Sequence, residues 1–404
     1  MLAALLACDG TLPEASAELD TCNAYIRQPM SAFDDSLPEP ADPHAEVYGP
    51  GMPVYVHLTW PADPSTSVAA LWLSGSETLA SQVQFGPDFT YGTTVDGASF
   101  LFATGDADGR VHEVHLCGLE PATTYHYRVG GESHWSGDRT FTTAPSPGTA
   151  APFSFGVMGD SRDGQDIMGA LFRQMDAQAP DFYATTGDMV GSGADVDEWK
   201  EWFAWSTERY SYRPIVPVQG NHEFHAQPFY ALIALPGNEQ WYSFDYANAH
   251  FVILSDTQAK ADDLEIQADW LAEDLAASDQ DWKIVMHHRP AWSSSDVHGS
   301  DAVLQDLWSP IEEFGDVRLD LAGHDHAYER FVPLKGGMPF PGGTTYVVTG
   351  GAGAPLYSNV GALSNSSVVY VGYHYVVVAI DGTRMVLTAY DLAGNVLDVV
   401  EFGR

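Results

Sequence analysis

The sequence predicts two folded domains, an N-terminal β-sandwich and a layered α/β domain with two packed mixed β-sheets flanked by helices. Short alternating segments separated by turns fill residues 54–143, and strand and helix patterns alternate after residue 152. A Pro-rich stretch, residues 145–152, separates the two patterns and is expected to be a linker. We therefore expect a sandwich over residues 47–144 and the α/β domain over residues 153–404.

The first domain contains segments in which apolar and polar residues alternate, which is the pattern of half-buried strands. They are residues 54–60, 68–73, 111–117, 125–129 and 139–142. The stretch LEPATTYHY, residues 119–127, resembles the approach to the sixth strand of fibronectin type III-like domains. In those domains a Tyr hydroxyl hydrogen-bonds back to the preceding loop.

The second domain contains short apolar runs that are followed, within a few residues, by an Asp, Asn or His that can bind a metal. They are residues 155–158, 182–184, 215–218, 284–286 and 319–322. Such a run indicates a buried strand with a loop at its carboxyl end. Open α/β sheets collect their sites at that edge, so Asp, Asn and His side chains should converge there.

Helix and strand patterns complete the second domain. Apolar residues at helical spacing predict helices over residues 167–175 and 264–275. Strand patterns return at residues 345–349, 373–380, 385–390 and 396–402. We expect these last strands to form a second sheet against the first.

The composition is strongly acidic. The chain has 404 residues with 17 Lys and Arg against 55 Asp and Glu, a net charge of −38. Such a surface repels nucleic acid and anionic membranes, so we expect neither as a partner. No apolar stretch is long enough for a membrane-spanning helix.

The first residues, 1–46, are predicted to be a tether. Leu5-Leu6-Ala7-Cys8 resembles the lipobox of bacterial lipoproteins, which would make this region a signal remnant and Cys8 a lipid anchor. An ordinary frayed N-terminus is the alternative. The first interpretation predicts a secreted or cell-envelope protein. Cys22 and Cys117 could then form a disulfide, or Cys117 could be a small buried apolar residue.

Six short boxes carry the chemistry of the second domain. They are GDSR (159–162), GD (187–188), GNHE (220–223), VMHH (285–288), DVH (296–298) and GHDH (323–326). In this order and spacing they resemble the calcineurin-like metallophosphoesterases, most closely the purple acid phosphatases. The resemblance extends from about residue 54 to the C-terminus, because the preceding segment also resembles the N-terminal domain of that family.

The resemblance implies a centre with two metal ions bridged by Asp188. The first ion would take Asp160, Asp188 and His326, and the second Asp188, Asn221, His287 and His324. Carboxylate, amide and imidazole ligands suit iron, zinc or manganese. Two such ions hold a phosphoryl group and lower the pKa of a bound water. The implied function is hydrolysis of phosphate monoesters by attack of a metal-bound hydroxide.

Two positions depart from the family pattern. Gly191 stands where purple acid phosphatases have a metal-binding Tyr, and Arg162 stands where other relatives have a His ligand. Water, Asp163 or His288 would complete the first site. We therefore expect a weak first site and a colourless protein, since no phenolate would bind ferric iron.

The remaining site residues would handle substrate. By resemblance His222 contacts the phosphate, with Glu223 orienting it, and His298 protonates the leaving group, with Asp296 as the competing acid. Arg162 could grip a phosphate oxygen or pair with an Asp such as Asp163.

Tyr328 has two interpretations, a donor to phosphate or a packed side chain.

Two other functions remain open at this stage. A phosphodiesterase could use the same site, because the motifs do not separate monoesters from diesters. A cell-surface binding protein with a degenerate phosphoesterase domain is the second alternative, and the intact ligand set argues against it. In either enzyme the partner is a small phosphorylated substrate.

Overall fold

A computed structural model describes residues 52–404 except residues 77, 105–106, 132–133, 258–260 and 359. The predicted tether, Cys8, Cys22 and the first residues of the predicted sandwich therefore lie outside the described residues. Cys117 is disulfide-bonded, so its interpretation as a free apolar residue is wrong. In the described part of the chain, no helix is both long and apolar enough to cross a membrane.

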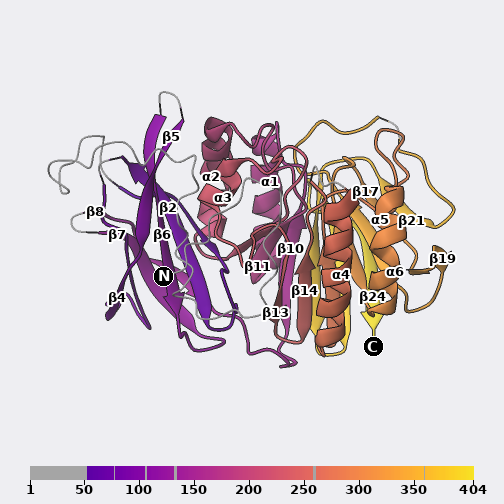
Figure 1. Cartoon of the computed structure of the whole chain (residues 1–404), viewed down its shortest axis with the longest axis horizontal. Helices are drawn as coiled ribbons and strands as arrows, with labels where there is room; N and C mark the ends of the chain where they lie inside the picture. The colour runs from indigo at the N-terminus through magenta and orange to yellow at the C-terminus, as the bar shows by residue number, and fades with distance from the viewer. Residues whose placement is uncertain (1–51, 77, 105–106, 132–133, 258–260, 359) are drawn as a thin grey trace.

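The N-terminal domain is a β-sandwich, as predicted (Figure 1). One sheet has the order β1-β2-β6-β5, and the other has the order β4-β3-β7-β8, with β9 also pairing with β7. The strands are β1 (Val54–Thr59), β2 (Ser67–Gly75), β3 (Gln82–Gly86), β4 (Thr93–Asp96), β5 (Ala98–Thr104), β6 (Ala107–Cys117), β7 (Thr124–Gly131), β8 (His134–Trp135) and β9 (Arg139–Thr142). Trp72, Val83, Val114 and Tyr127 fill the space between the sheets.

The sandwich contains strands that the sequence patterns did not reveal. Strand β4 reads TTVD and is mostly exposed, so it lacks the apolar alternation that marks a half-buried strand. The resemblance to fibronectin type III-like domains extends to a tyrosine contact: the Tyr125 hydroxyl accepts a hydrogen bond from the Glu120 N–H at 3.0 Å.

The second domain consists of two packed mixed sheets with helices outside, which confirms the predicted fold class (Figure 1). The six-stranded sheet has the order β12-β11-β10-β22-β23-β24, and the seven-stranded sheet has the order β13-β14-β15-β16-β20-β17-β21. Phe155 joins the layers, because its ring stacks on Phe182 and meets Phe251 edge-on, each with centroids 5.2 Å apart.

The bounds of the elements in this domain are as follows. The strands are β10 (Phe153–Met158), β11 (Phe182–Thr185), β12 (Ile215–Pro217), β13 (Tyr242–Tyr246), β14 (Ala249–Ile253), β15 (Trp282–Met286), β16 (Leu319–Ala322), β17 (Tyr328–Phe331), β18 (Leu334–Lys335), β19 (Met338–Pro339), β20 (Thr345–Thr349), β21 (Ser366–Tyr370), β22 (His374–Asp381), β23 (Arg384–Asp391) and β24 (Val396–Gly403). The helices are α1 (Gln165–Met175), η2 (Asp176–Gln178), α2 (Val196–Tyr210), α3 (Gln227–Leu232), α4 (Ala261–Ala277), α5 (Ala302–Leu307) and α6 (Ser309–Phe314).

The prediction that the last strands form one second sheet is wrong. Only β20 and β21 join the seven-stranded sheet, whereas β22, β23 and β24 extend the six-stranded sheet. Strand β22 pairs antiparallel with β10 along its length. This pairing covers an edge of β10 that would otherwise expose a row of unpaired backbone groups.

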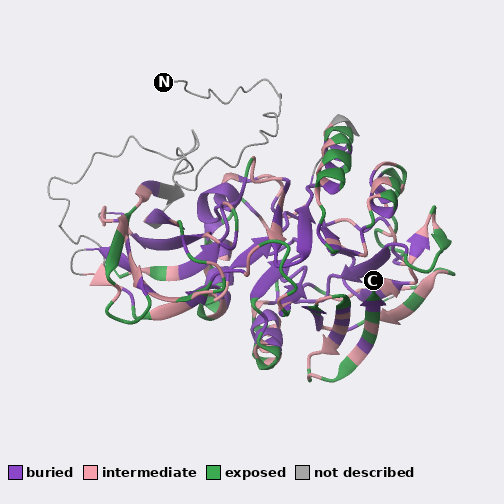
Figure 2. Ribbon diagram, turned by 90° about the horizontal axis from the view of Figure 1, so that it is seen from below, coloured by how far each residue is buried: buried purple, intermediate pink, exposed green. Residues whose placement is uncertain are grey.

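The two domains share one continuous apolar core (Figure 2). Trp60 of the sandwich packs against Phe182 and Tyr246 of the α/β domain, at centroid distances of 5.1 and 5.7 Å. The His57 ring stacks on Phe203 of α2 at 4.3 Å, and its Nε2 donates to the Leu232 carbonyl of α3 at 2.6 Å. Apolar and polar contacts therefore fix the sandwich against helices α2 and α3.

A buried histidine between two carboxylates links stability to pH. His250 bonds Asp245 at 2.7 Å and Asp274 at 2.8 Å. Burial opposes protonation, but the two carboxylates raise the pKa of His250 to about 9. Since this is above the ordinary value, the charged contacts stabilise the fold fully below about pH 6.5. This contribution is lost as pH rises through 9.

We predict that the His250→Gln variant is less stable than the parent at pH 6 and that the difference narrows above pH 9. Denaturant unfolding at a series of pH values measures it. His374→Gln is the matched control, because burial lowers the pKa of His374 to about 4 and its ring stays neutral over this range. A difference for His250→Gln that is the same at pH 6 and pH 10 would contradict the assignment.

Candidate metal centre

The predicted ligands come together where strands of both sheets end. Asp160, Asp188 and Asn221 follow β10, β11 and β12 of the six-stranded sheet, while His324 and His326 follow β16 of the seven-stranded sheet. Parallel pairing of β10 with β11, and of β11 with β12, brings three of these loops to one edge. The expected convergence of Asp, Asn and His side chains is therefore present.

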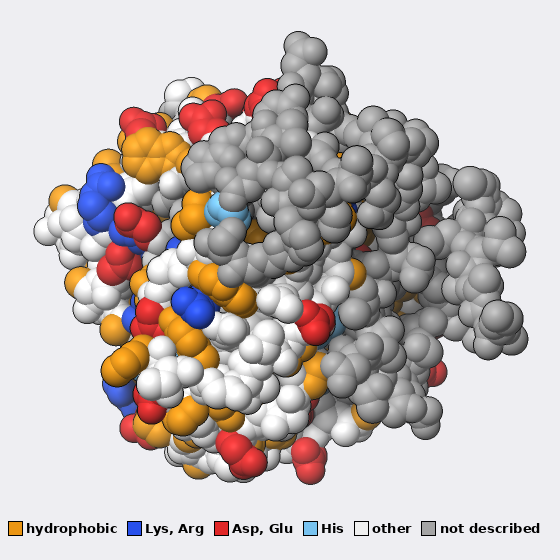
Figure 3. All heavy atoms as spheres, turned by 90° about the vertical axis from the view of Figure 1, so that its left-hand side faces the viewer, with side chains coloured by type: hydrophobic (Ala, Val, Ile, Leu, Met, Phe, Trp, Pro, Cys, Tyr) orange, Lys and Arg blue, Asp and Glu red, His pale blue; other side chains and the backbone are white. Residues whose placement is uncertain are grey.

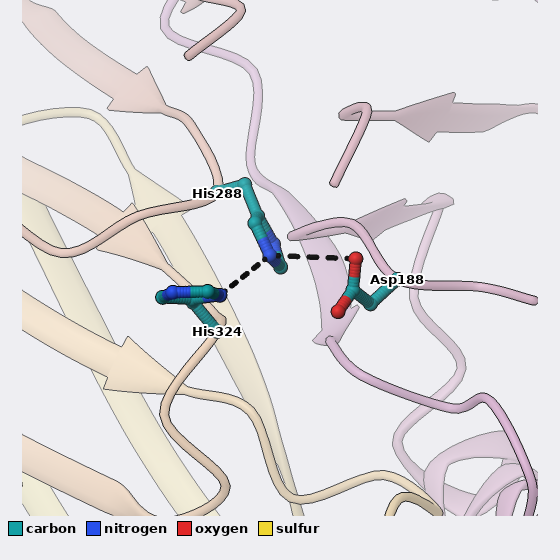
Figure 4. A group of neighbouring side chains, drawn as sticks. All are labelled: Asp188, His288 and His324. Carbon is teal, nitrogen blue, oxygen red and sulfur yellow. Dashed lines mark hydrogen bonds and ion pairs between the residues drawn. The ribbon is translucent and has the colours of Figure 1, made fainter. Parts of the chain in front are cut away.

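One group of ligand atoms surrounds a common point. Atoms of Asp188, His288 and His324 lie within 4.8 Å of one another (Figure 4). His288 Nε2 is 3.4 Å from Asp188 Oδ1, 3.1 Å from His324 Nδ1 and 3.0 Å from Asn221 Oδ1. The carboxylate, the amide oxygen and both imidazoles turn potential ligand atoms inward, which suits a divalent ion of borderline softness.

Asp160 and His326 form a second group beside the first. His326 Nε2 lies 3.6 Å from Asp160 Oδ1, a buried oxygen with no hydrogen-bond partner among the described residues. His326 Nδ1 donates to the Pro355 carbonyl at 2.7 Å, which turns Nε2 toward Asp160. Burial and the neighbouring Asp188 raise the pKa of Asp160. An orphaned buried oxygen of this kind fits a metal ligand better than a structural carboxylate.

Contrary to the prediction, His287 lies outside the group around Asp188, and His288 lies within it instead. His287 is buried on the other side of the strand end, with Nδ1 3.3 Å from Asp256 and Nε2 2.9 Å from Asp320. Successive residues of an extended segment point to opposite faces, so only one of the two histidines can reach the centre. His288 Nδ1 donates to the Thr186 carbonyl at 2.7 Å, leaving Nε2 directed at the ligands.

Several of the candidate ligands have a backbone conformation that is uncommon for their residue type. Asp160, Asp188 and His324 have φ values of 58°, 52° and 68°. The left-handed region costs energy for any residue with a Cβ, and such residues cluster at functional sites. The packing is also close: a Cβ on Gly220 would lie 2.1 Å from Asp188 Oδ1, and one on Gly323 would lie 2.5 Å from Asp160 Oδ2.

Glu223 supports the centre but does not orient His222, contrary to our expectation. Its carboxylate is fully buried and accepts the N–H groups of Asp188, Met189 and Gly220, at 2.9, 2.8 and 2.7 Å. Burial and the nearby Asp188 raise the pKa of Glu223 to about 7. Glu223 therefore shapes the loop that presents Asp188.

His222 is oriented by a backbone carbonyl instead. Its Nδ1 donates to the Gly191 carbonyl at 2.6 Å, and its Nε2 lies 3.8 Å from Asp188 Oδ2. The Gly191 N–H donates to Glu198 at 2.6 Å. Gly191 occupies the position where purple acid phosphatases have the metal-binding Tyr. Its carbonyl holds His222, and its N–H holds Glu198.

Arg162 lies beside the bridging carboxylate. Its Nε is 3.7 Å from Asp188 Oδ2 and is buried without a hydrogen-bond partner among the described residues, while Nη1 donates to Asp163 at 2.6 Å. The pairing with Asp163 that we considered is therefore present. Arg162 remains close enough to Asp188 for its guanidinium to act at the centre.

The structure brings His298 to the centre and excludes Tyr328. The His298 ring stacks on His324 with centroids 3.9 Å apart, and both His298 and Asp296 are exposed on the same loop. Tyr328 is fully buried and donates to Asp398 at 2.7 Å, so the prediction that it binds phosphate is wrong and its interpretation as a packed side chain holds.

Sequence reasoning missed Tyr357, a half-buried residue at the centre. Its ring stacks on His326 at 4.4 Å, and its hydroxyl donates to the His324 carbonyl at 3.1 Å. It follows no apolar run and belongs to none of the six boxes, so no pattern pointed to it.

The protonation of the ligands also fits metal binding. Burial opposes a charge on His288, but Asp188, Asp160 and Asp256 raise its pKa to about 9. Burial and neighbouring cations lower the pKa of His324. One imidazole is thus held near carboxylates as a cation and the other as a neutral ligand. A metal ion would replace the proton of His288 as the positive charge of the group.

Comparisons with known proteins agree with this centre. Residues 53–143 match the model described as the purple acid phosphatase N-terminal domain, and residues 153–328 match the calcineurin-like phosphoesterase model. Purple acid phosphatase 22 of Arabidopsis thaliana is 28% identical over 61% of this chain and 59% of its own. Phosphoenolpyruvate phosphatase of Allium cepa is 25% identical over 84% of this chain and 75% of its own.

Solved structures show the same fold. The purple acid phosphatase PPD1 from yellow lupin superposes with a TM-score of 0.75 at 21% identity, covering 88% of this chain and 75% of that chain. The structure of PhoD superposes with a TM-score of 0.64 at 13% identity, covering 88% of this chain and 93% of that chain. Both likenesses concern the fold.

We predict that His288→Ala loses metal and His287→Gln does not. Removing the His288 imidazole deletes a ligand atom, so the variant should retain fewer ions after dialysis. His287→Gln should lower thermal stability, because two buried carboxylates lose a partner, while the metal content stays at the parent level. Elemental analysis and thermal unfolding measure both. A folded His287 variant that lacks metal, beside a His288 variant that keeps it, would reverse our assignment.

Proposed function

Since the chain is a purple acid phosphatase-like metallophosphoesterase, we propose that it hydrolyses phosphate monoesters. The observation that supports this most is the convergence of Asp160 and His326 beside Asp188, Asn221, His288 and His324. This arrangement can hold two ions, and iron, zinc and manganese suit the donors. Two bound ions would supply a water of lowered pKa and positive charge for the phosphoryl oxygens.

The protein's own side chains would hold the phosphate. The buried Nε of Arg162 lies 3.7 Å from Asp188 Oδ2 and has no hydrogen-bond partner among the described residues, and the planar guanidinium matches two phosphate oxygens. His222 turns Nε2 to the same side because Gly191 holds its Nδ1. These two donors would position the phosphoryl group and stabilise the charge that develops on its oxygens.

The leaving group would depart on the side of His298. This ring covers His324 and is exposed on its outer side, so it can reach the oxygen of a departing alcohol. Protonation of that oxygen is the step that an alkyl ester needs most, because an alkoxide is a poor leaving group. Asp296 is exposed on the same loop, and the ring contact favours His298.

Charge favours monoesters over diesters. A phosphate monoester is a dianion near neutral pH and a diester is a monoanion, so Arg162 beside two ions binds the monoester more strongly. A diesterase on the same centre is the alternative outcome. The third alternative, a cell-surface binding protein, would not need these convergent metal-binding side chains.

We also propose that the protein acts outside the cytoplasm, secreted or in the cell envelope. The disulfide at Cys117 favours an oxidising compartment.

On the part of the sandwich surface visible in Figure 3, acidic, basic and apolar side chains are interspersed, and no broad basic patch for nucleic acid is seen.

The proposal is tested by a panel of substrates. The purified protein, stripped with a chelator and reloaded separately with iron, zinc or manganese, should hydrolyse alkyl and aryl monoesters faster than the matching diesters. The stripped protein should be inactive. Faster diester hydrolysis would identify a phosphodiesterase, and no hydrolysis by any metal form would overturn the enzymatic assignment.

We predict that Arg162→Ala raises KM for a monoester roughly 10- to 100-fold, the scale of one or two lost hydrogen bonds to a charged group. Inhibition by inorganic phosphate should weaken in parallel. Arg162→Lys keeps the positive charge but not the planar guanidinium, so its KM should lie between those of the parent and of Arg162→Ala. Unchanged KM and phosphate inhibition in Arg162→Ala would show that the guanidinium interacts with Asp163 and not with phosphate.

A further inference from the structure

The loop that carries His298 is fixed to the strand that follows the last metal ligands. Residues 293–300 contain no helix or strand beyond an isolated bridge from Ser295 to Val360. The tip, with Asp296 and His298, is exposed. A loop of this kind would sample many conformations without fixed contacts at its base.

Glu329 of β17 provides the main contact at that base. The carboxylate is 1% exposed and accepts the Ser294 N–H at 2.8 Å. It also accepts short hydrogen bonds from the hydroxyls of Ser294 and Ser366. Hydrogen bonds to a buried carboxylate are stronger than neutral ones, and they offset the desolvation of the charge.

Asp325, which lies between two ligand histidines, provides a second contact. Its Oδ2 accepts the Ser293 hydroxyl at 2.5 Å and the Gly299 N–H at 3.2 Å. The two ends of the loop are thus bound to one carboxylate. Ser300 links the two ends of the loop, since its hydroxyl accepts the Ser293 N–H and donates to the Ser293 carbonyl.

The contacts have a geometric consequence. Asp325 and Glu329 lie in the same short segment as His324 and His326, so the position of the loop is fixed relative to these two histidines. In this position the His298 ring lies over His324, with ring centroids 3.9 Å apart. The hydroxyl of Ser293 donates to Asp325, and the hydroxyls of Ser294 and Ser366 donate to Glu329.

We propose that Glu329 is a positioning residue that, together with Asp325, holds loop 293–300 so that His298 stays over the metal centre to protonate the leaving group. The proposal rests on the proposed phosphoesterase function. Glu329 is buried and bonds to the loop, so its effect on the reaction would come from fixing the position of His298.

The test compares Glu329→Ala, Glu329→Gln and Ser294→Ala with Asp398→Ala as the matched control. Asp398 accepts hydrogen bonds from Tyr328 and Arg330, the neighbours of Glu329 on the same strand, and has no part in loop 293–300 in the described contacts. Its removal takes side-chain hydrogen bonds from β17 and none of the described contacts of loop 293–300.

The first readout is the dependence on the leaving group. Glu329→Ala should lower kcat for an alkyl phosphate roughly 100-fold or more, the scale of a lost general acid, and lower kcat for p-nitrophenyl phosphate far less, since that phenolate leaves without protonation. Glu329→Gln can accept the Ser294 N–H and donate to the hydroxyls, so it should restore part of the loss. Asp398→Ala should lower both rates equally or leave both unchanged.

The second readout does not need activity. Hydrogen–deuterium exchange of the peptide covering residues 291–301 should rise in Glu329→Ala and Ser294→Ala and stay at the parent level in Asp398→Ala, with metal content retained in all three. Unchanged exchange in Glu329→Ala, or equal losses on both esters, would overturn the proposal. If the parent cleaves neither ester, the proposed function fails, and exchange alone still decides whether Glu329 holds the loop.

Discussion

Two carboxylates buried at one sheet edge are the constraint on which the rest of the centre depends. Asp160 and Asp188 are 0% and 1% exposed. Like charges in a low dielectric repel strongly, so the fold must supply positive charge and hydrogen-bond donors around them. The N–H groups of His324 and His222 bond the two carboxylates, and His288 lies within 3.4 Å of Asp188. Left-handed backbone and close glycine contacts follow from packing these groups so tightly.

The support behind the ligands has the same logic. Glu223 collects N–H groups of the loop that presents Asp188, and Asp256 accepts the N–H groups of His288 and Arg289 at 3.1 and 2.6 Å. Each is a fully buried carboxylate that bonds to backbone, so each fixes a main-chain course as well as a side chain. The candidate ligand atoms are therefore preorganised by two buried carboxylates that bond to the backbone behind them.

Much of this architecture was accessible from sequence, because strand-end ligands depend on local pattern. Apolar runs followed by polar ligand types predicted the sheet edge, and the order of the six boxes carried the resemblance to the family. The choice between His287 and His288 was not accessible, since it depends on the pleat at the end of β15 and on the buried partners Asp256 and Asp320. The roles of Glu223 and Tyr357 and the split of the last strands depend on long-range contacts that leave no periodic signature.

The shared core of the two domains has a consequence for how the chain is made. The sandwich is synthesised before the α/β domain, so its face with His57 and Trp60 is made before helix α2 and strand β13. That face is apolar and must stay soluble until its partners emerge. Once they do, it offers the surface against which α2 and α3 pack. In the same sequence order, the loops of Asp160, Asp188 and Asn221 precede the segments that carry His288, His324 and His326.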